Sequence, residues 1–332
     1  MMAAKSSSIL RRALLYVPAS SPRMLTKSLG LASDNITYDL EDSVTPSAKP
    51  QAREALRAHL AALPSRPRRA AARELAVRIN AVSTPHALSD LAALAAQPSL
   101  DAVVVPKVNG ASDLTFLTDA LQHLAPERHQ SGGDGSGGGE NNKPPIKLIA
   151  LIESARAVMD LREICAASPY LSGLIFAAED FALDLSLTRT PGLHEFLYAR
   201  SAIATAARAA GLPSTIDLVC TSYKGPEGLA RLEEECRGGK AMGFNGKQCI
   251  HPSQVETVQR LFAPAKAEIE WAVRVVVADE KAARAGRGAW TLDGAMIDAP
   301  VVGKAKAIVE KAQNCDIDVK GLQEKWKDQE PE

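Results

Sequence analysis

Charged side chains end five of the apolar segments in this chain of 332 residues. These ends read Asp39-Leu40-Glu41-Asp42, Arg78-Ile79-Asn80, Lys107, Glu153 and Glu179-Asp180. A carboxylate in such a place lies at the rim of a low-dielectric core, where it must be paired or metal-bound because an isolated buried charge is too costly. Two or three convergent carboxylates without a histidine or cysteine beside them favour an oxygen-preferring ion such as Mg²⁺. Arg78 would add a planar, bidentate clamp for the carboxylate of a substrate.

One cation, one arginine fork and an apolar wall are the parts needed to hold an α-keto or α-hydroxy acid. They would also stabilise the enolate or alkoxide of carbon–carbon cleavage. The alternative is that these charges only form salt bridges at the rim. No G-x-S-x-G, H-E-x-x-H or Walker loop indicates another chemistry. Of the six histidines, only His251 falls near the predicted active face.

The elements that position these residues are eight short apolar or β-branched segments, each followed by a helical pattern. They are Ala13–Pro18, Asn35–Asp42, Glu74–Asn80, Asp101–Val108, Ile146–Glu153, Gly173–Asp180, Ser214–Cys220 and Met242–Ile250. Their near-continuous hydrophobicity is typical of parallel strands covered on both faces. Eight such alternations predict a (β/α)8 TIM barrel with its chemistry at the C-terminal strand ends, and an open doubly wound sheet is the alternative.

The predicted barrel spans residues 13–263 and follows an N-terminal segment, residues 1–12. A flexible, low-complexity insertion is expected at residues 125–145, after a helix and before a strand. It contains a literal G-x-G-x-x-G, but a dinucleotide fingerprint must follow a strand and open a helix. We expect a C-terminal helical extension over residues 264–319 and a charged tail over residues 320–332.

Composition limits the classes of partner. The chain has 39 Lys and Arg residues and 39 Asp and Glu residues, so its formal net charge is zero. Overall charge therefore gives no reason to expect binding to nucleic acid or to a membrane surface. No apolar run approaches the roughly 18 residues of a membrane span. The five scattered cysteines lack a C-x-x-C pair, which argues against disulfides and against structural zinc. Together these features predict a soluble, intracellular protein.

Basic residues and a serine run precede Asp34, the first acidic residue. This pattern is similar to a mitochondrial presequence, although the first predicted strand begins at about Ala13 and leaves few residues to cleave. The alternative is a short frayed terminus. The mitochondrial matrix and the cytosol therefore both stay open as compartments.

The quoted segments resemble the citrate lyase β-subunit/HpcH–HpaI aldolase family, most closely its citramalyl-CoA lyase and malyl-CoA lyase branch. The resemblance covers roughly residues 11 to 312. Its landmarks include Tyr38-Asp39-Leu40-Glu41-Asp42, Val77-Arg78-Ile79-Asn80, Leu151-Ile152-Glu153-Ser154, Phe176-Ala177-Ala178-Glu179-Asp180, Asn245-Gly246-Lys247-Gln248-Cys249-Ile250-His251-Pro252 and Met296-Ile297-Asp298-Ala299-Pro300. It implies a (β/α)8 barrel with a C-terminal helical extension, assembled as a homotrimer or hexamer.

The resemblance also implies roles for single residues. Glu153 and Asp180 would hold Mg²⁺, and Arg78 would bind the carboxylate of pyruvate or glyoxylate. The coenzyme A moiety would contact Tyr16, Arg23, Lys27 and the backbone near Cys249 and Ile250. Asp298 would be the acid/base, delivered by the extension into a neighbouring subunit's active site.

The implied activity is Mg²⁺-dependent cleavage of a 3-hydroxyacyl-CoA of the citramalyl-CoA or malyl-CoA type to acetyl-CoA and pyruvate or glyoxylate, together with the reverse condensation. Two alternatives stay open. One is a citrate lyase β-subunit that acts on an acyl-carrier thioester, and the other is a non-catalytic protein that binds acyl-CoA or keto acid. Ala177 and Ala178 stand where the family pattern has Gly-Gly or Gly-Ala, which leaves the choice between pyruvate and glyoxylate open.

Overall fold

The computed structural model describes residues 9–63, 73–129 and 144–332. The chain divides into two compact units. The first unit ends at Gln259, and the second comprises Arg260–Glu332. Among the described residues, no helix combines the length and the apolar character needed to cross a bilayer.

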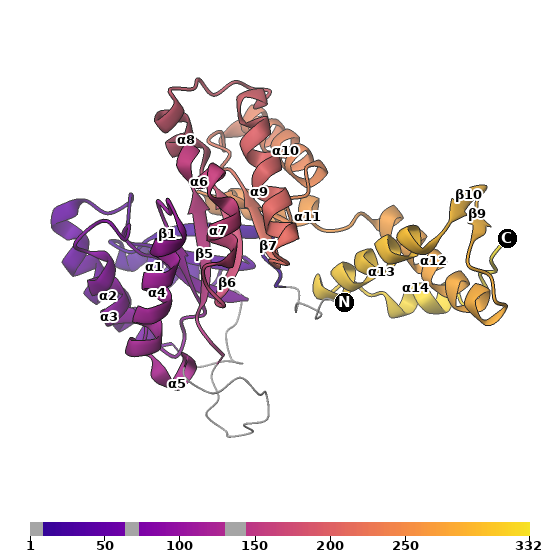
Figure 1. Cartoon of the computed structure of the whole chain (residues 1–332), viewed down its shortest axis with the longest axis horizontal. Helices are drawn as coiled ribbons and strands as arrows, with labels where there is room; N and C mark the ends of the chain where they lie inside the picture. The colour runs from indigo at the N-terminus through magenta and orange to yellow at the C-terminus, as the bar shows by residue number, and fades with distance from the viewer. Residues whose placement is uncertain (1–8, 64–72, 130–143) are drawn as a thin grey trace. The chain divides into compact units, whose positions relative to one another are not determined.

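The first unit is a closed barrel of eight parallel strands in sequential order, with helices between them (Figure 1). The strands are β1 (Ala13–Pro18), β2 (Asn35–Asp39), β3 (Glu74–Arg78), β4 (Ala102–Val105), β5 (Lys147–Ile152), β6 (Leu171–Phe176), β7 (Ser214–Asp217) and β8 (Gly246–Cys249). Pairing of β1 with β8 closes the barrel, with Leu14 opposite Gln248. The predicted (β/α)8 barrel is confirmed and the open sheet is wrong. Several strands are shorter than predicted: β2 ends at Asp39 and β6 at Phe176.

Small and branched side chains fill the barrel interior. They are Leu14, Ala76, Ala102, Val104, Ile149, Leu151, Ile175 and Ile216. The N-terminal end is closed differently, by Arg11, whose guanidinium is buried and bonds to Glu74 (2.7 Å) and to the hydroxyl of Ser172 (2.9 Å). Arg11 lies within the predicted N-terminal segment, but its guanidinium is bonded to residues of β3 and β6. A buried charge needs such partners.

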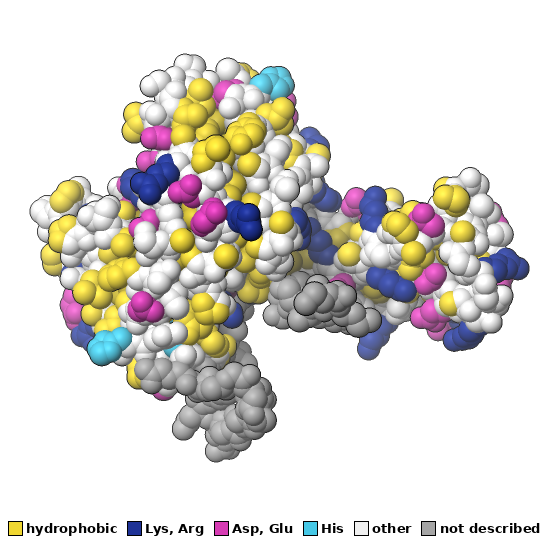
Figure 2. Space-filling model, in the orientation of Figure 1, with side chains coloured by type: hydrophobic (Ala, Val, Ile, Leu, Met, Phe, Trp, Pro, Cys, Tyr) yellow, Lys and Arg dark blue, Asp and Glu magenta, His cyan; other side chains and the backbone are white. Residues whose placement is uncertain are grey.

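The helices that surround the strands are α1 (Pro22–Ser28), α2 (Lys49–Ala61), α3 (Ala87–Leu94), α4 (Ala111–Leu124), α5 (Pro126–His129), α6 (Ala155–Met159), α7 (Leu161–Ala166), α8 (Ala178–Leu185), α9 (Leu197–Ala209) and α10 (Gly225–Ala241). Helix α11 (Val255–Phe262) spans the division between the units. On the face in Figure 2, acidic and basic side chains are interspersed over the described surface, as expected from the zero net charge.

The start of the predicted insertion is structured. Helix α5 lies within it, and Arg128 donates to the carbonyl of Pro144 at 2.9 Å. The Nε2 atom of His129 accepts a hydrogen bond from the amide of Ile146 at 3.3 Å. These bonds join the two ends of the predicted segment, and Arg128 also donates to the carbonyl of Leu100, before β4, at 2.9 Å. Residues 130–143, with the glycine pattern, lie outside the described residues.

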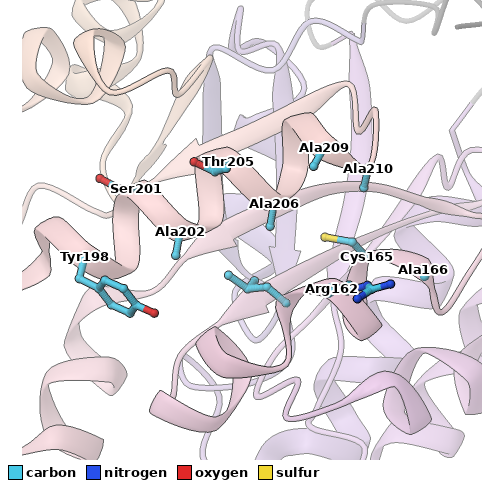
Figure 3. Close-up of a pocket in the computed structure, with 11 residues that line it drawn as sticks. Arg162, Cys165, Ala166, Tyr198, Ser201, Ala202, Thr205, Ala206, Ala209 and Ala210 are labelled. Carbon is cyan, nitrogen blue, oxygen red and sulfur yellow. The ribbon is translucent and has the colours of Figure 1, made fainter.

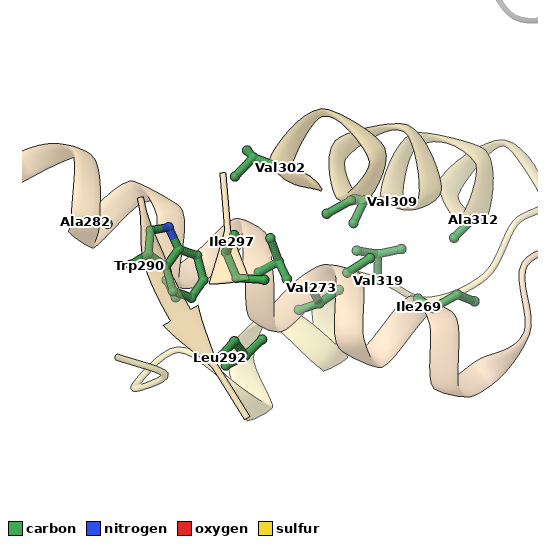
Figure 4. Close-up of a cluster of buried hydrophobic side chains, with 14 residues drawn as sticks. Ile269, Val273, Ala282, Trp290, Leu292, Ile297, Val302, Val309, Ala312 and Val319 are labelled. Carbon is green, nitrogen blue, oxygen red and sulfur yellow. The ribbon is translucent and has the colours of Figure 1, made fainter. Parts of the chain in front are cut away.

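The second unit contains α12 (Lys266–Arg284), the hairpin of β9 (Trp290–Leu292) and β10 (Ala295–Ile297), α13 (Ala299–Asn314) and α14 (Lys320–Lys325). Positive φ angles at Asp293 and Gly294 form the two-residue turn between the strands, as hairpins of this length require. The unit has its own apolar core (Figure 4). The predicted charged tail contains α14, and Leu322 and Trp326 within it pack against this core.

Candidate active site

A cavity of about 440 Å³ lies at the C-terminal ends of the barrel strands. Its lining residues are Tyr16, Pro18, Asp39, Asp42, Ser43, Arg78, Leu151, Ala177, Ala178, Glu179, Asp180, Val219, Gln248 and Ile250. The C-terminal face is where (β/α)8 barrels carry their chemistry. The cavity combines an apolar wall with charged groups of both signs.

A larger cavity of about 860 Å³ lies between α7 and α9, on the helical layer of the barrel (Figure 3). Its walls are alanine, serine, threonine and tyrosine side chains of α9, with Leu161, Arg162 and Cys165 of α7 opposite them. Its lining contains no carboxylate, and it lies away from the C-terminal ends of the strands. We therefore place the chemistry in the smaller cavity, since size alone does not make a site.

Arg78 is the last residue of β3, and its guanidinium is held on two sides. Its Nε and Nη2 atoms each donate to a carboxylate oxygen of Asp39 at 2.7 Å, and Nη1 lies 3.0 Å from Oε2 of Glu41. The ring of Tyr16 lies 4.8 Å from the guanidinium carbon. Burial would raise the pKa of Asp39, but the hydrogen bonds and the charge of Arg78 outweigh it and lower that pKa. Asp39 thus fixes the plane of the guanidinium.

Glu153 follows β5 directly, and its side chain is buried. Its Oε1 atom accepts a hydrogen bond from the amide of Lys107 at 3.1 Å. Lys107 has a φ of 52°, a left-handed conformation that is uncommon outside glycine and is often found at functional sites. Burial, and secondly the charge of Asp180, raise the pKa of Glu153 to about 8. A further positive charge beside Glu153 would therefore stabilise its ionised form.

Asp180 lies at a different place from the one predicted. Glu179 and Asp180 are in the first turn of α8 and not at the end of β6, because the strand stops at Phe176. A helix N-terminus is a favourable position for carboxylates. The side chain of Asp180 is partly exposed in the cavity, 3.8 Å from Nζ of Lys107.

The charges around the cavity do not balance. Among the described residues there, the carboxylates are Asp39, Glu41, Asp42, Glu153, Glu179 and Asp180, whereas the cations are Arg78, Lys107 and Arg189. Within the described chain, no group of three or more His, Cys, Asp or Glu side chains could hold a metal alone. Two carboxylates are nevertheless sufficient for Mg²⁺, which usually keeps several waters or substrate oxygens. The residues present therefore fit a Mg²⁺ ion.

The predicted coenzyme A residues fall into two groups. Tyr16 and Ile250 line the cavity, and the hydroxyl of Tyr16 donates to Oε1 of Gln248 at 3.0 Å. Arg23 and Lys27 are exposed on α1, one turn apart. The side chain of Cys249 is buried on the outer side of β8, so at this position only the backbone could reach a ligand at the strand ends.

The structure gives local contacts for three further residues, Gln248, His251 and Asp298. Gln248, on β8, was missed as a site residue, although it stands two residues before the cavity residue Ile250, which follows the strand. His251 is exposed and caps the turn at Pro252–Gln254 through its Nδ1 atom. Asp298 belongs to the second unit, where its Oδ1 atom accepts a hydrogen bond from the amide of Val301 at 3.2 Å and so caps α13.

Fold and site together define a (β/α)8 protein with a carboxylate-rich cavity and an anchored arginine at its C-terminal face. Residues 12–252 match the profile of the HpcH/HpaI aldolase/citrate lyase family, and the chain belongs to this family. A citrate lyase subunit beta of Haemophilus influenzae is 34% identical over 92% of this chain and 98% of its own length. The mitochondrial citramalyl-CoA lyase of Rattus norvegicus is 32% identical, over 91% of this chain and 86% of its own length.

Other relatives carry other names. A (3S)-malyl-CoA thioesterase of Cereibacter sphaeroides is 33% identical, over 91% of this chain and 94% of its own length. Among solved structures, CitE from Mycobacterium tuberculosis in complex with magnesium, acetoacetate and coenzyme A matches with a TM-score of 0.68 and 32% identity. That match covers 91% of this chain and 97% of that one. At this level of identity the relatives agree on the family and differ in the named substrate.

Proposed function

We propose that the protein is a Mg²⁺-dependent carbon–carbon lyase that cleaves a 3-hydroxyacyl-CoA of the citramalyl-CoA or malyl-CoA type to acetyl-CoA and pyruvate or glyoxylate, and that it also catalyses the reverse condensation. The observation that carries this proposal is the joint placement of Arg78, Glu153 and Asp180 at the C-terminal face of one barrel. An arginine clamp beside two oxygen ligands suits a 2-hydroxy acid group, which presents a carboxylate and a hydroxyl.

Glu153 and Asp180 would hold the ion, which when bound would supply positive charge to the substrate oxygens on which negative charge develops. Arg78 would bind the carboxylate of the keto-acid portion through Nη1, the nitrogen that Asp39 does not engage, in place of its contacts with Glu41 and Asp42. Leu151, Ala177 and Ala178 would exclude water from the breaking bond. A base takes up the proton of the substrate hydroxyl as the carbonyl of the keto acid forms and the carbon–carbon bond breaks. The electron pair of that bond passes to the α-carbon of the thioester, which must then take up a proton.

Asp298 would supply this proton from a neighbouring subunit, within a homotrimer or hexamer. The exposed Arg23 and Lys27 of α1 would bind phosphates of coenzyme A, and the backbone near Cys249 and Ile250 would contact its pantetheine arm. We further propose that the protein acts inside the cell, in the cytosol or the mitochondrial matrix, without a nucleic-acid or membrane partner.

The test is to incubate the purified full chain and Mg²⁺ with citramalyl-CoA, malyl-CoA and 3-hydroxy-3-methylglutaryl-CoA in separate reactions. Keto acid and free thiol are measured separately, because a lyase releases keto acid with the thioester intact. We expect keto acid without an equivalent of free thiol, and loss of the reaction with EDTA. Free thiol alone would instead indicate the thioesterase activity that names the Cereibacter relatives.

Two other results would replace the proposal. Cleavage only of a thioester on an acyl-carrier protein would support a citrate lyase β-subunit, the name carried by the Haemophilus relative. Tight acyl-CoA binding without turnover of any substrate would support a non-catalytic binding protein. Retention of Arg78, Glu153, Asp180 and Asp298 together argues against the non-catalytic alternative, since a silent copy has no need of all four.

A further inference from the structure

Arg189, which follows α8 in the chain, connects four parts of the barrel beside the cavity. Its Nη1 atom pairs with the carboxylate of Glu179 in the first turn of α8. Its Nη2 atom donates to the carbonyl of Val219 at 3.0 Å and to Oε1 of Glu235 at 2.9 Å. The other oxygen of Glu235 lies 3.0 Å from Nζ of the fully buried Lys247.

Two of these partners connect Arg189 to the wall of the cavity. Glu179 and Val219 both line the cavity, the first from α8 and the second from the segment after β7. Glu235 is buried on α10, and Lys247 is on β8, so the inner end of the network is fixed. Arg189 itself does not line the cavity and has no contact with the site where a substrate would lie.

The first turn of α8 needs such a connection. The buried face of this helix is fixed by Phe181, whose ring packs against Phe176 and Phe196 at centroid distances of 5.4 and 6.4 Å. Glu179, in contrast, is half-exposed and stands next to Asp180 with the same charge. Without a cation at Glu179, two adjacent carboxylates would compete for any positive charge in the cavity.

We propose that Arg189 is a positioning residue: it holds Glu179 away from the metal site and fixes the start of α8, so that Asp180 can bind Mg²⁺ together with Glu153. The inference rests on the proposed function, because it takes Glu153 and Asp180 as the metal ligands. Partners of metal ligands in other proteins change metal affinity by about 10- to 100-fold when they are removed.

The experiment measures the Mg²⁺ dissociation constant of the full chain by titration calorimetry, without substrate. Through-space electrostatics alone predicts tighter binding of Mg²⁺ in Arg189→Ala, because a positive charge is lost near the site. Positioning predicts the opposite sign, and we expect affinity to fall by about 10-fold or more. Arg189→Lys should be intermediate, since an ammonium lacks the planar fork that bridges Glu179, Val219 and Glu235.

Arg200→Lys is the matched control. Arg200 makes a buried bidentate pair with Asp217 elsewhere in the same barrel, at 3.1 and 2.6 Å. This variant should lose thermal stability and keep the wild-type Mg²⁺ affinity. If Arg189→Ala does not fold, Arg189→Lys carries the test with the same expected direction.

Equal or tighter Mg²⁺ binding in folded Arg189 variants would overturn the inference and leave the proposed function intact. A wild-type chain that binds no Mg²⁺ would instead overturn the metal-dependent function, and the inference with it. The two failures are therefore distinguishable from the wild-type titration alone.

Discussion

Glu153 is the residue on which the proposed metal site depends most. It is buried, accepts one backbone hydrogen bond and has a raised pKa because of burial and the nearby charge of Asp180. A carboxylate in this environment destabilises the fold unless a cation compensates for it. Its presence is therefore easier to explain by function than by stability.

We expect Glu153→Gln to lose Mg²⁺-dependent turnover by at least about 100-fold while folding as well as the wild type or better. The amide oxygen can still accept the hydrogen bond from Lys107, and the cost of ionising a buried carboxyl group is gone. Steady-state kinetics over a range of Mg²⁺ concentrations and a thermal melt check both parts. Glu163→Gln, at an exposed position of α7, is the control and should change neither. Wild-type kinetics in Glu153→Gln would remove Glu153 from the metal site.

The sequence predicted which residues gather at the site better than how they pair. Arg78 and Glu153 were found because parallel strands of a barrel bring their C-terminal ends together. The partner of Arg78 was missed because it depends on register: Asp39 stands opposite Arg78 in the pairing of β2 with β3. Asp180 was placed one element too early, since an Ala-Ala-Glu-Asp run can end a strand or begin a helix.

At the scale of elements, α1 presents its two basic side chains to solvent on a helix that follows β1 at the active face. Arg23 and Lys27 are spaced four residues apart and therefore project from the same side. Phosphate groups are the ligands that such a pair would suit. The assignment of these residues to coenzyme A can be tested by comparing substrates with and without phosphates.

The double variant Arg23→Ala/Lys27→Ala should raise KM for the CoA thioester by roughly tenfold for each residue and leave kcat unchanged. The same variant should show wild-type KM for a pantetheine thioester, which lacks the nucleotide phosphates. Arg57→Ala, at an exposed position of α2, is the control and should behave as the wild type. Equal KM changes for both substrates would contradict a role in phosphate binding.

Element types were predicted well where hydrophobicity is continuous and poorly where charge dominates the composition. All eight strands of the barrel were found, and β4 is the clearest case because it is apolar and buried along its whole length. β8 is also fully buried, although its sequence includes Lys247 and Gln248. Helix α14 was missed because charged residues surround its two apolar anchors. The available signal was the spacing of Leu322 and Trp326, four residues apart, which is the helical period.

At the scale of the whole molecule, the proposed acid/base and the proposed metal ligands belong to different units of the chain. Asp298 lies in the unit Arg260–Glu332, and Glu153 lies in the barrel. If Asp298 serves a neighbouring subunit, one complete site needs two chains. This arrangement predicts complementation between two inactive variants.

Glu153→Gln and Asp298→Asn should each be inactive alone, with acyl-CoA binding and assembly retained in Asp298→Asn. Co-expressed with separate tags and purified as mixed oligomers, they should recover activity, because some sites combine an intact Glu153 with an intact Asp298 from the neighbour. Random mixing would restore about a quarter of the sites. Mixed oligomers without activity would place Asp298 in its own subunit's site, and full activity of Asp298→Asn alone would remove its role.

The cap that Asp298 forms on α13 has a consequence for how this sequence could diverge. Asparagine caps a helix about as well as aspartate does, so the exchange would leave the start of α13 and the packing behind it undisturbed. A descendant could therefore lose its proton donor in one substitution and remain indistinguishable in fold, stability and assembly. Among relatives of this chain, the residue at this one helix start would report on activity more directly than overall similarity.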